Sequence, residues 1–285
     1  MSYTFIDELR AVYPVRHLCR WLQISASSYY AWQRRPLCQR KLMNQILLVH
    51  IRAIHAEMRQ TYGSPRIHAE LRARGLRVNL KRVARLMRLH HIQARHKRKY
   101  RVTTKVDPKL PVAPNLLAQD FQANTPNQKW VTDVTYVPTA EGWLYLAAVL
   151  DLYSRRIIGW AMSAIQDTDL VVNALQMAIG RRQPGRGTMH HSDRGRQYGS
   201  ARYRDVLDAK HFAVSMSGTG NCYDNAPMES FFGTLKAELI HWRRYRTREE
   251  ARQDIVWYIE RFYNARRRHS ALGYRSPLEF EQSMA

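Results

Sequence analysis

The stretch 129-KWVTDVTYVP-138 decides the fold class of this chain. It is rich in β-branched and aromatic residues, which is typical of a strand, and Pro138 is expected to close it. Asp133 lies in the middle of this strand, where burial of a carboxylate is costly unless the group is paired or holds a metal ion. We therefore predict a strand of an α/β sheet that carries a functional carboxylate.

A second carboxylate follows another short strand. Asp193 comes directly after 188-TMHHS-192 and shortly before Gly195. This setting is typical of the carboxyl end of a strand, where open α/β sheets place their ligand sites. Asp151, at the end of the apolar run 143-WLYLAAVLD-151, is a rival for the role of Asp133, but its setting 151-DLYSRR-156 fits a turn aspartate better.

A third carboxylate, Glu229, falls near the start of a predicted helix that Asn225 or Asp224 can cap, with Pro227 in the first turn. Glu229 and Lys236 share one helix face, beside an apolar stripe. The stripe consists of Met228, Phe231, Phe232, Leu235 and Leu239. Converging carboxylates suit a pair of Mg²⁺ ions, which prefer hard oxygen ligands, and Lys236 would then reach a phosphate. The plainer alternative is three solvated carboxylates on an α/β surface.

Several stretches resemble the DDE transposase and integrase superfamily, which includes the retroviral integrases. The three signature stretches are 130-WVTDVTY-136, 191-HSDRGRQY-198 and 225-NAPMESFFGTLK-236. In particular, the chain resembles the second-frame product of bacterial insertion sequences that use ribosomal frameshifting. This likeness runs over nearly the whole length, from 5-FIDELRAVYPVRHLCRWLQISASSYYAW-32 to 263-YNARRRHSALGYRSPLEF-280. Arg196, where a small polar residue is more usual, is a departure that leaves the carboxylates unaffected.

The resemblance implies a ribonuclease-H-like α/β catalytic domain, a mixed sheet flanked by helices, preceded by all-α helix-turn-helix DNA-binding domains. It implies that Asp133, Asp193 and Glu229 hold two Mg²⁺ ions, with Mn²⁺ as a substitute, and that Lys236 contacts a terminal phosphate. The implied activity is nicking of insertion-sequence ends and 3′-hydroxyl strand transfer, by a copy-out, paste-in route. The implied partners are double-stranded DNA of the terminal inverted repeats and the target, and a homo-oligomer on DNA. An upstream-frame partner or fusion stays open.

The charge of the chain points to an anionic partner. Its 285 residues hold 46 Lys and Arg against 23 Asp and Glu, a formal net charge of +23. Residues 1–106 hold 23 of the basic side chains and only 4 of the acidic ones. Nucleic acid is the usual partner of such a surface. A solvated basic surface or a membrane-surface patch is disfavoured, because the charges lie among short helical patterns.

The basic part of the chain reads as two helical units. Residues 11–35 predict a helix-turn-helix, for which an ordinary helical hairpin is the alternative. Residues 42–92 predict a second unit, in which Ser64 caps a helix and Gly75 ends it. Basic residues also fill 96–106 and end the last long helix, where they either bind DNA or simply favour the helix dipole. The predicted DNA contacts, besides Lys236, are Tyr29, Tyr30, Arg34, Arg35, Lys81, Arg82, Arg85, Arg88, Lys97, Arg98, Lys99, Arg266, Arg267 and Arg268.

From about residue 128 the pattern changes to three strands and then to alternating helices and strands, which is typical of an α/β fold. The predicted division is 1–40 for the helix-turn-helix, 41–95 for the second helical DNA-binding domain, 96–126 for a basic and Pro-rich linker, 127–242 for the catalytic core and 243–285 for a helical extension. The three cysteines form no C-x-x-C pair, and no apolar run approaches the ~20 residues that span a bilayer. We therefore expect a cytoplasmic protein associated with the bacterial nucleoid.

Two other functions fit parts of the sequence. One is a non-catalytic DNA-binding regulator whose carboxylates no longer act, and metal-dependent nicking would separate it from the enzyme. The other is a nuclease of ribonuclease-H type that cleaves RNA–DNA hybrids. The basic helical front third suits duplex DNA ends and speaks against that nuclease.

Overall fold

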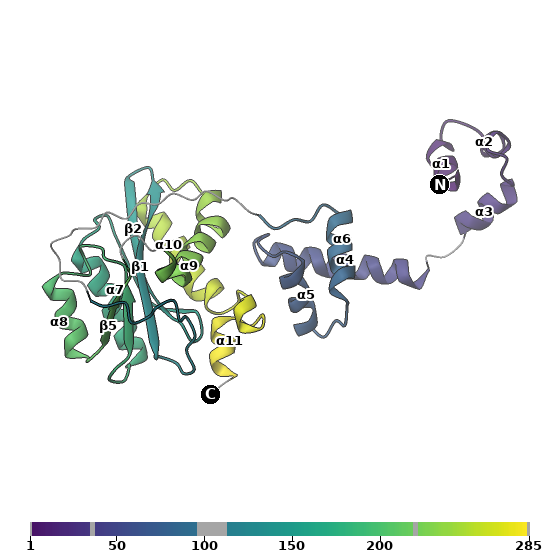
Figure 1. The fold of residues 1–285 in the computed structure, drawn as a ribbon. Coiled ribbons are helices and arrows are strands. Elements are labelled where there is room, and N and C mark those ends of the chain that lie inside the picture. The colour runs from purple at the N-terminus through teal and green to yellow at the C-terminus, as the bar shows by residue number, and fades with distance from the viewer. Residues whose placement is uncertain (1, 35–37, 96–112, 219–221, 284–285) are drawn as a thin grey trace.

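The computed structural model describes residues 2–34, 38–95, 113–218 and 222–283. Its central sheet consists of β1 (Lys129–Thr139), β2 (Gly142–Asp151), β3 (Arg156–Ser163), β4 (Met189–Ser192) and β5 (Ala213–Met216). The strand order is β3-β2-β1-β4-β5 (Figure 1). The first three strands run antiparallel, whereas β4 pairs with β1 and β5 pairs with β4 in parallel. The predicted mixed α/β sheet is confirmed.

One prediction about β1 is wrong: the strand continues through Pro138 to Thr139. The reason is the short length of β4, which pairs with β1 only over Lys129 to Val131. Beyond that point one edge of β1 has no strand beside it among the described residues. Pro138 lacks a backbone N–H, and a strand edge is where proline is tolerated.

Successive side chains of β1 point to opposite faces of the sheet, and both faces are covered. Trp130 belongs to a core cluster with α7 (Thr168–Arg182) and α8 (Ala201–Ala209). Val131 belongs to a cluster with α9 (Ala226–Glu238) and α10 (Arg248–Trp257). On the α7 side, a Cβ atom at Gly159 would lie only 2.3 Å from the carbonyl oxygen of Ala174. Glycine at this position therefore lets α7 lie directly on β3.

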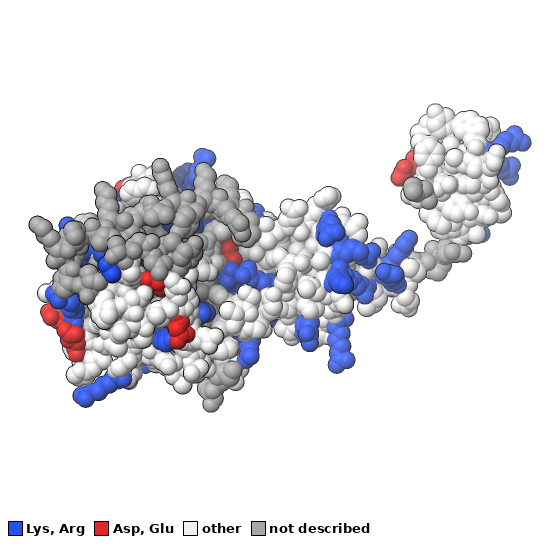
Figure 2. All heavy atoms as spheres, viewed as in Figure 1, with Lys and Arg blue, Asp and Glu red and all other residues white. Residues whose placement is uncertain are grey.

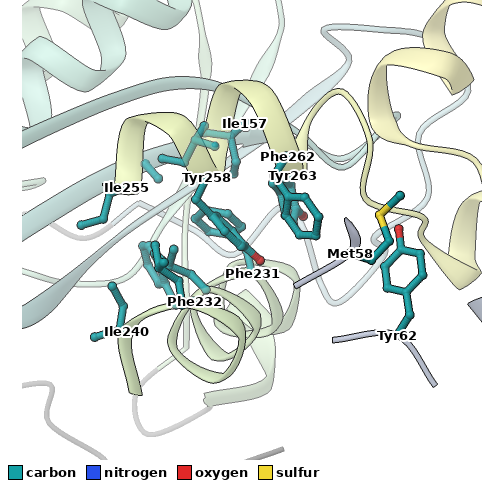
Figure 3. Packing of buried hydrophobic residues seen from close by; sticks show 14 of the residues in the cluster. Met58, Tyr62, Ile157, Phe231, Phe232, Ile240, Ile255, Tyr258, Phe262 and Tyr263 are labelled. Carbon is teal, nitrogen blue, oxygen red and sulfur yellow. The ribbon is translucent and has the colours of Figure 1, made fainter. Parts of the chain in front are cut away.

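The C-terminal segment continues the core on the α9 side. After α10 the chain forms a π-helical turn over Tyr258–Tyr263, and α11 (Pro277–Gln282) starts with a capping box between Ser276 and Glu279. Figure 3 shows the aromatic rings of this turn against Phe231 of α9, whose ring centre is 4.8 Å from that of Tyr263. The apolar side chains of α10 and of this turn, Ile255, Tyr258, Ile259 and Phe262, are all buried. Short 3₁₀ turns occupy Cys222–Asn225, Ile240–Trp242 and Ser270–Leu272.

The first helical unit lies apart from the rest of the chain in Figure 1. It consists of α1 (Ser2–Leu9), α2 (Val15–Trp21) and α3 (Ala26–Arg34). The two helices predicted within residues 11–35 are present as α2 and α3. The sequence analysis missed α1, an eight-residue helix without acidic residues in its first turn or basic residues in its last.

The second helical unit consists of α4 (Gln39–Glu57), α5 (Ser64–Ala73) and α6 (Leu80–Leu89). Its surface carries a dense group of Lys and Arg side chains (Figure 2). Gly75, with φ of 81°, follows the end of α5 as predicted. The predicted cap of α5 is wrong, because Ser64 is already helical and Gly63 occupies the cap position.

The second helical unit is joined to the part of the chain that contains the sheet by a shared core and by hydrogen bonds. The fully buried Tyr62 carries the central ones. Its hydroxyl donates to the carbonyl oxygen of Arg266 at 3.3 Å and accepts from the N–H of Arg268 at 2.8 Å. Among the described residues, no helix combines the length and the apolar character needed to cross a bilayer.

Candidate active site

Two aspartates lie beside each other on neighbouring parallel strands. β1 and β4 pair in register, with Lys129 opposite Met189 and Val131 opposite His191. Asp133 lies two residues beyond the last of these pairs on β1, and Asp193 lies two residues beyond it, just after the end of β4. The charge of Asp193 acts on Asp133, as expected for neighbours. The strand and strand-end settings predicted from the sequence therefore bring the two carboxylates to one place on the sheet.

The electrostatic setting of the two aspartates is unfavourable for two bare anions. Burial raises the pKa of Asp133 well above its usual value, and the charge of Asp193 raises it further. Burial also raises the pKa of Asp193. One backbone donor opposes this at each residue: Val134 N–H at 2.7 Å from Asp133, and Gly195 N–H at 2.9 Å from Asp193. Such a pair favours a bound cation, because a nearby positive charge stabilises the ionised forms.

Glu229 lies in the first turn of α9, and the start of this helix is tied to β1. Asn225 donates its Nδ2 proton to the carbonyl oxygen of Thr132 at 3.0 Å, next to Asp133. The charge of Glu229 raises the pKa of Asp133, as expected for a close neighbour, and burial raises the pKa of Glu229 itself. Asn225 occupies the cap position of α9, but its side chain makes no capping hydrogen bond.

The three carboxylates do not form a closed set of metal ligands. Within the described ranges, no three His, Cys, Asp or Glu side chains form a group that would hold a metal ion. Asp133 and Asp193 are neighbours, and Glu229 faces them from α9 without completing the set. The chemistry of the donors still fits Mg²⁺, because all three are carboxylates and each is carried by a different structural element.

Lys236 lies farther along α9, on the side of the carboxylates. Its Nζ atom is 4.9 Å from the ring centre of Tyr136 on β1, a cation–π contact. Its positive charge lowers the pKa of Asp133, while burial lowers its own pKa. Lys236 therefore flanks the carboxylates, which is where a lysine that contacts a phosphate would stand.

The hydroxyl groups of Thr132 and Tyr198 lie near the two aspartates, and the sequence analysis missed both. Thr132 donates to the carbonyl oxygen of Ala148 at 2.9 Å, and its Oγ1 lies 3.4 Å from the hydroxyl of Tyr198. Tyr198 is buried, and burial together with the nearby negative charges, among them Asp133 and Asp193, raises its pKa well above the usual value. A tyrosine in the loop stretch 193-DRGRQY-198 gives no sequence signal of such burial.

Two further buried polar residues fix the segments that carry the carboxylates. His191 on β4 lies 2.8 Å from the hydroxyl of Ser215 on β5, and burial lowers its pKa to about 4, so it is neutral at pH 7. Asp224, before α9, accepts from Asn115 Nδ2 at 3.0 Å and from Gly218 N–H at 2.8 Å. The sequence analysis considered Asp224 only as a helix cap.

Asp151, the rival first ligand, belongs to the scaffold. It is fully buried and accepts from the N–H groups of Asn127 and Tyr153 at 2.9 and 3.0 Å. Arg182 of α7 forms a salt bridge with it at 2.9 Å. This surrounding is that of a turn aspartate with its charge already compensated, as its sequence setting favoured.

Apart from Lys236 and the arginines at 266–268, the predicted DNA contacts fall into three groups. Tyr29 is a correction, because it is completely buried in the core of the first helical unit and donates to Asp7 at 2.9 Å. Arg35, Lys97, Arg98 and Lys99 lie outside the described residues. Exposed or partly exposed side chains are found at Tyr30, Arg34, Lys81, Arg82, Arg85 and Arg88. For this last group, contact with DNA stays a prediction.

Within the arginine cluster 266–268, only the buried Arg267 is a correction, whereas contact of Arg266 and Arg268 with DNA stays a prediction. All three arginines form salt bridges. Arg267 is buried and forms a two-pronged salt bridge with Glu238, with Nε and Nη2 at 3.0 and 2.8 Å from one carboxylate oxygen. Arg268 lies 2.5 Å from Glu70 of α5. Arg266 forms a salt bridge with Glu57 of α4. Their partners lie far away in the sequence, so local pattern could not reveal them.

Comparison with known proteins agrees with this architecture. Two family models described as integrase core domain match residues 123–222 and 210–277, and one described as HTH-like domain matches residues 42–100. The chain is 44% identical over 283 residues to transposase InsF of insertion sequence IS3A from Escherichia coli K12, covering 99% of this chain and 98% of InsF. It is 45% identical over 265 residues to the uncharacterized 31 kDa protein of insertion element IS600 from Shigella sonnei, covering 93% and 97%.

Among solved structures, the chain is similar to the catalytic core domain of HTLV-2 integrase in complex with magnesium (trimeric form). The identity is 14% and the TM-score 0.45, and the match covers 56% of this chain and 99% of the integrase core.

The five-stranded sheet and the matched integrase core place the catalytic part in the ribonuclease-H-like integrase class, a class of polynucleotidyl transferases. Within that class, the chain belongs to the family of IS3 transposases, because its identity to InsF extends over nearly the full length of both proteins.

Proposed function

We propose that this protein is a DNA transposase that nicks the ends of its insertion sequence and joins the freed 3′-hydroxyl to target DNA. The observation that supports the proposal is the interaction of Asp133, on β1, with the charges of Asp193, directly after β4, and of Glu229, in the first turn of α9. Two neighbouring, partly buried carboxylates of like charge are costly to ionise, so they favour a bound cation.

Asp133, Asp193 and Glu229 would hold the divalent metal ions, two Mg²⁺ or two Mn²⁺. Bound there, the ions would supply activation of the attacking hydroxyl and stabilisation of the leaving oxygen. The N–H groups of Val134 and Gly195 each bind one oxygen of an aspartate, so they orient both carboxylates. Glu229 would reach the pair from α9 through rotation of its flexible side chain.

Lys236 would contact a phosphate of the DNA end, because its ammonium group stands beside the carboxylates. Exposed arginines and lysines of α6 would grip the duplex through its phosphates. We further propose that the active form is a homo-oligomer on DNA, that transposition follows a copy-out, paste-in route, and that an upstream-frame partner or fusion contributes to end recognition.

The test is nicking and joining on a plasmid that carries the two DNA ends flanking the reading frame. Wild type, Glu229→Gln and the control Asp208→Asn, an exposed residue of α8, would be compared with and without Mg²⁺. Wild type and the control should give products only with Mg²⁺, and Glu229→Gln should give none while still binding DNA. Strand transfer by Glu229→Gln would contradict the assignment of the metal ligands.

An inactive wild type would be assayed again as a fusion with the upstream frame, and with an RNA–DNA hybrid as substrate. Products from the fusion support the transposase with an upstream partner. Inactivity of the fusion would overturn the enzymatic proposal in favour of a DNA-binding regulator. Cleavage of the hybrid alone would identify a nuclease of ribonuclease-H type.

A further inference from the structure

A basic pocket of about 320 Å³ lies on another face of α9, where the sheet, α5 and the C-terminal segment meet. Ligand sites have volumes of about 300–1,000 Å³, so this pocket is near the lower limit. Its polar lining includes Arg66, Arg155, Ser230, Thr234, Arg267 and His269. The residues come from α5, the turn between β2 and β3, α9 and the segment after the π-helical turn.

A single carboxylate, that of Glu238, lies close to both Arg267 and Arg66. Glu238 accepts three hydrogen bonds from Arg267 and one from the hydroxyl of Tyr258 at 2.7 Å. Arg66 stands 3.8 Å from the same carboxylate, beyond hydrogen-bond distance. Burial lowers the pKa of Arg66, and the charge of Arg267 lowers it further. The Arg66 charge is therefore only weakly compensated.

Arg155 forms no salt bridge among the described residues, although the charge of Asp151 acts on it and raises its pKa. It donates from Nη2 to the carbonyl oxygen of Phe121 at 3.1 Å, and burial lowers its pKa more than Asp151 raises it. Its backbone has φ of 59°, in the left-handed region that side chains other than glycine rarely adopt. Buried charges in proteins are normally paired, so two partly buried arginines without a full partner indicate an anionic ligand.

The first turn of α9 adds further attraction for an anion. Ser230 lies in this part of the helix, and the Asn225 side chain leaves the helix start without a capping hydrogen bond. The N-terminus of this 13-residue helix carries partial positive charge. His269 contributes a hydrogen-bonding ring without charge, because burial and then the charges of Arg267, Arg66 and Arg155 lower its pKa to about 2.

We infer that this pocket binds a phosphate group of the DNA strand that occupies the active site. Glu229 and Ser230 are successive residues of α9, so their side chains point about 100° apart around the helix. A strand that crosses the start of α9 from the carboxylates would therefore bring a neighbouring phosphate to Arg66 and Arg155. The identity of the strand as DNA rests on the proposed function, whereas the preference for phosphate rests on the pocket alone.

The test measures DNA binding by the full chain in EDTA, so that it does not depend on cleavage. The variant is the double substitution Arg66→Gln and Arg155→Gln. The matched control is Arg186→Gln with Lys210→Gln, which removes two exposed positive charges just before β4 and β5, at the opposite end of β4 from Asp193. Fluorescence anisotropy of a labelled duplex from the element end would be recorded between 50 and 200 mM salt, after thermal melts have shown that both variants fold.

The pocket variant should bind the duplex roughly tenfold more weakly than wild type, as expected for the loss of charged hydrogen bonds to one phosphate. The slope of log affinity against log salt should become shallower by about 0.9, the value for one phosphate contact. The control should keep the wild-type affinity within about twofold. Equal losses in variant and control, or unchanged binding by the variant, would overturn the inference.

A second arm separates DNA from a free phosphate compound. The NMR signals of the His269 ring would be followed while dTMP or inorganic phosphate is added to wild type and to the pocket variant. Shifts in wild type alone, together with weaker DNA binding by the variant, support the inference. Shifts in wild type with unchanged DNA binding by the variant would overturn the DNA assignment in favour of a free nucleotide. Strand transfer by Glu229→Gln would contradict the assignment of the metal ligands. It would not affect the evidence that the pocket binds a phosphate.

Discussion

The junction between α5 and the C-terminal segment and the active site bury charge in opposite ways. At the junction, the Arg267 guanidinium and the Glu238 carboxylate cancel each other. At the active site, Asp133 and Asp193 are neighbours of like charge, each with one backbone donor. Paired buried charges hold a structure together, whereas unpaired like charges persist only where an external ion compensates them. The presence or absence of an internal counter-charge therefore distinguishes structural charged residues from those of the active site.

The largest expected effect is on activity. Asp193→Asn should lower the Mg²⁺-dependent nicking rate by at least ~10³-fold, because a metal ligand is lost. The same change removes a like charge beside Asp133, so the metal-free variant should melt at the same temperature as wild type or higher. Initial rates and thermal melts in EDTA would measure both. A clear drop in melting temperature would mean that Asp193 belongs to the scaffold.

The next effect concerns stability at the junction. Glu238→Gln leaves the buried Arg267 without a counter-charge and should cost about 3–5 kcal/mol of unfolding free energy. Urea denaturation would measure it, with Glu249→Gln as the control. Glu249 has an exposed side chain that lies 3.8 Å from Arg252, and such surface pairs contribute about 0–1 kcal/mol. If both substitutions lowered the unfolding free energy equally, the buried ion pair would contribute no more to stability than the exposed one, which would contradict the prediction.

The junction also predicts a dependence on pH through His269. Its pKa is lowered to about 2 in the folded protein, so the unfolded chain binds a proton first as the pH falls below about 6.5. The contribution of His269 to stability should be constant above that pH and decrease below it, by at most about 3 kcal/mol between pH 6.5 and 4.5. His269→Gln should flatten this part of the curve, while His211→Gln, an exposed control, should leave it unchanged. An identical slope in wild type and His269→Gln would show that His269 does not titrate in this way.

A smaller effect is expected from Tyr62→Phe. The substitution removes the acceptor of the Arg268 N–H and the donor to the Arg266 carbonyl, so it should cost about 1 kcal/mol. Tyr30→Phe, on the exposed surface of α3, is the control and should cost nothing measurable. Chemical denaturation would compare them, and a neutral Tyr62→Phe would show that the shared apolar core alone joins the two parts.

Local patterns in the sequence predicted much of the catalytic part. The predicted order of three strands followed by alternating helices and strands is observed as β1, β2 and β3 followed by α7, β4, α8 and β5. The settings of Asp133 and Asp193 predicted a strand and a strand end, and the parallel register of β1 and β4 makes them neighbours. These features succeed because each depends on residues close together in the chain.

The failures share the opposite cause, which is dependence on distant residues. In the sequence, Arg267 and Arg268 look like basic residues at a helix end. In the structure, Arg267 forms a salt bridge with Glu238, and Arg268 forms one with Glu70. Tyr29 was predicted to contact DNA from its place in the helix-turn-helix, but its side chain packs in the core of the first helical unit. No local pattern distinguishes an exposed arginine or tyrosine from one that the tertiary fold buries and pairs.

The most direct test of the central claim is a Mn²⁺ titration of the full chain followed by electron paramagnetic resonance, which counts free Mn²⁺ ions. Wild type should bind Mn²⁺, and Asp133→Asn, which removes one of the two neighbouring charges, should bind it much more weakly. Glu238→Gln, whose charge lies in the paired junction, should bind as wild type does wherever it remains folded. Equal Mn²⁺ binding by wild type and Asp133→Asn would contradict the account, because the unpaired carboxylates would then not be the metal site.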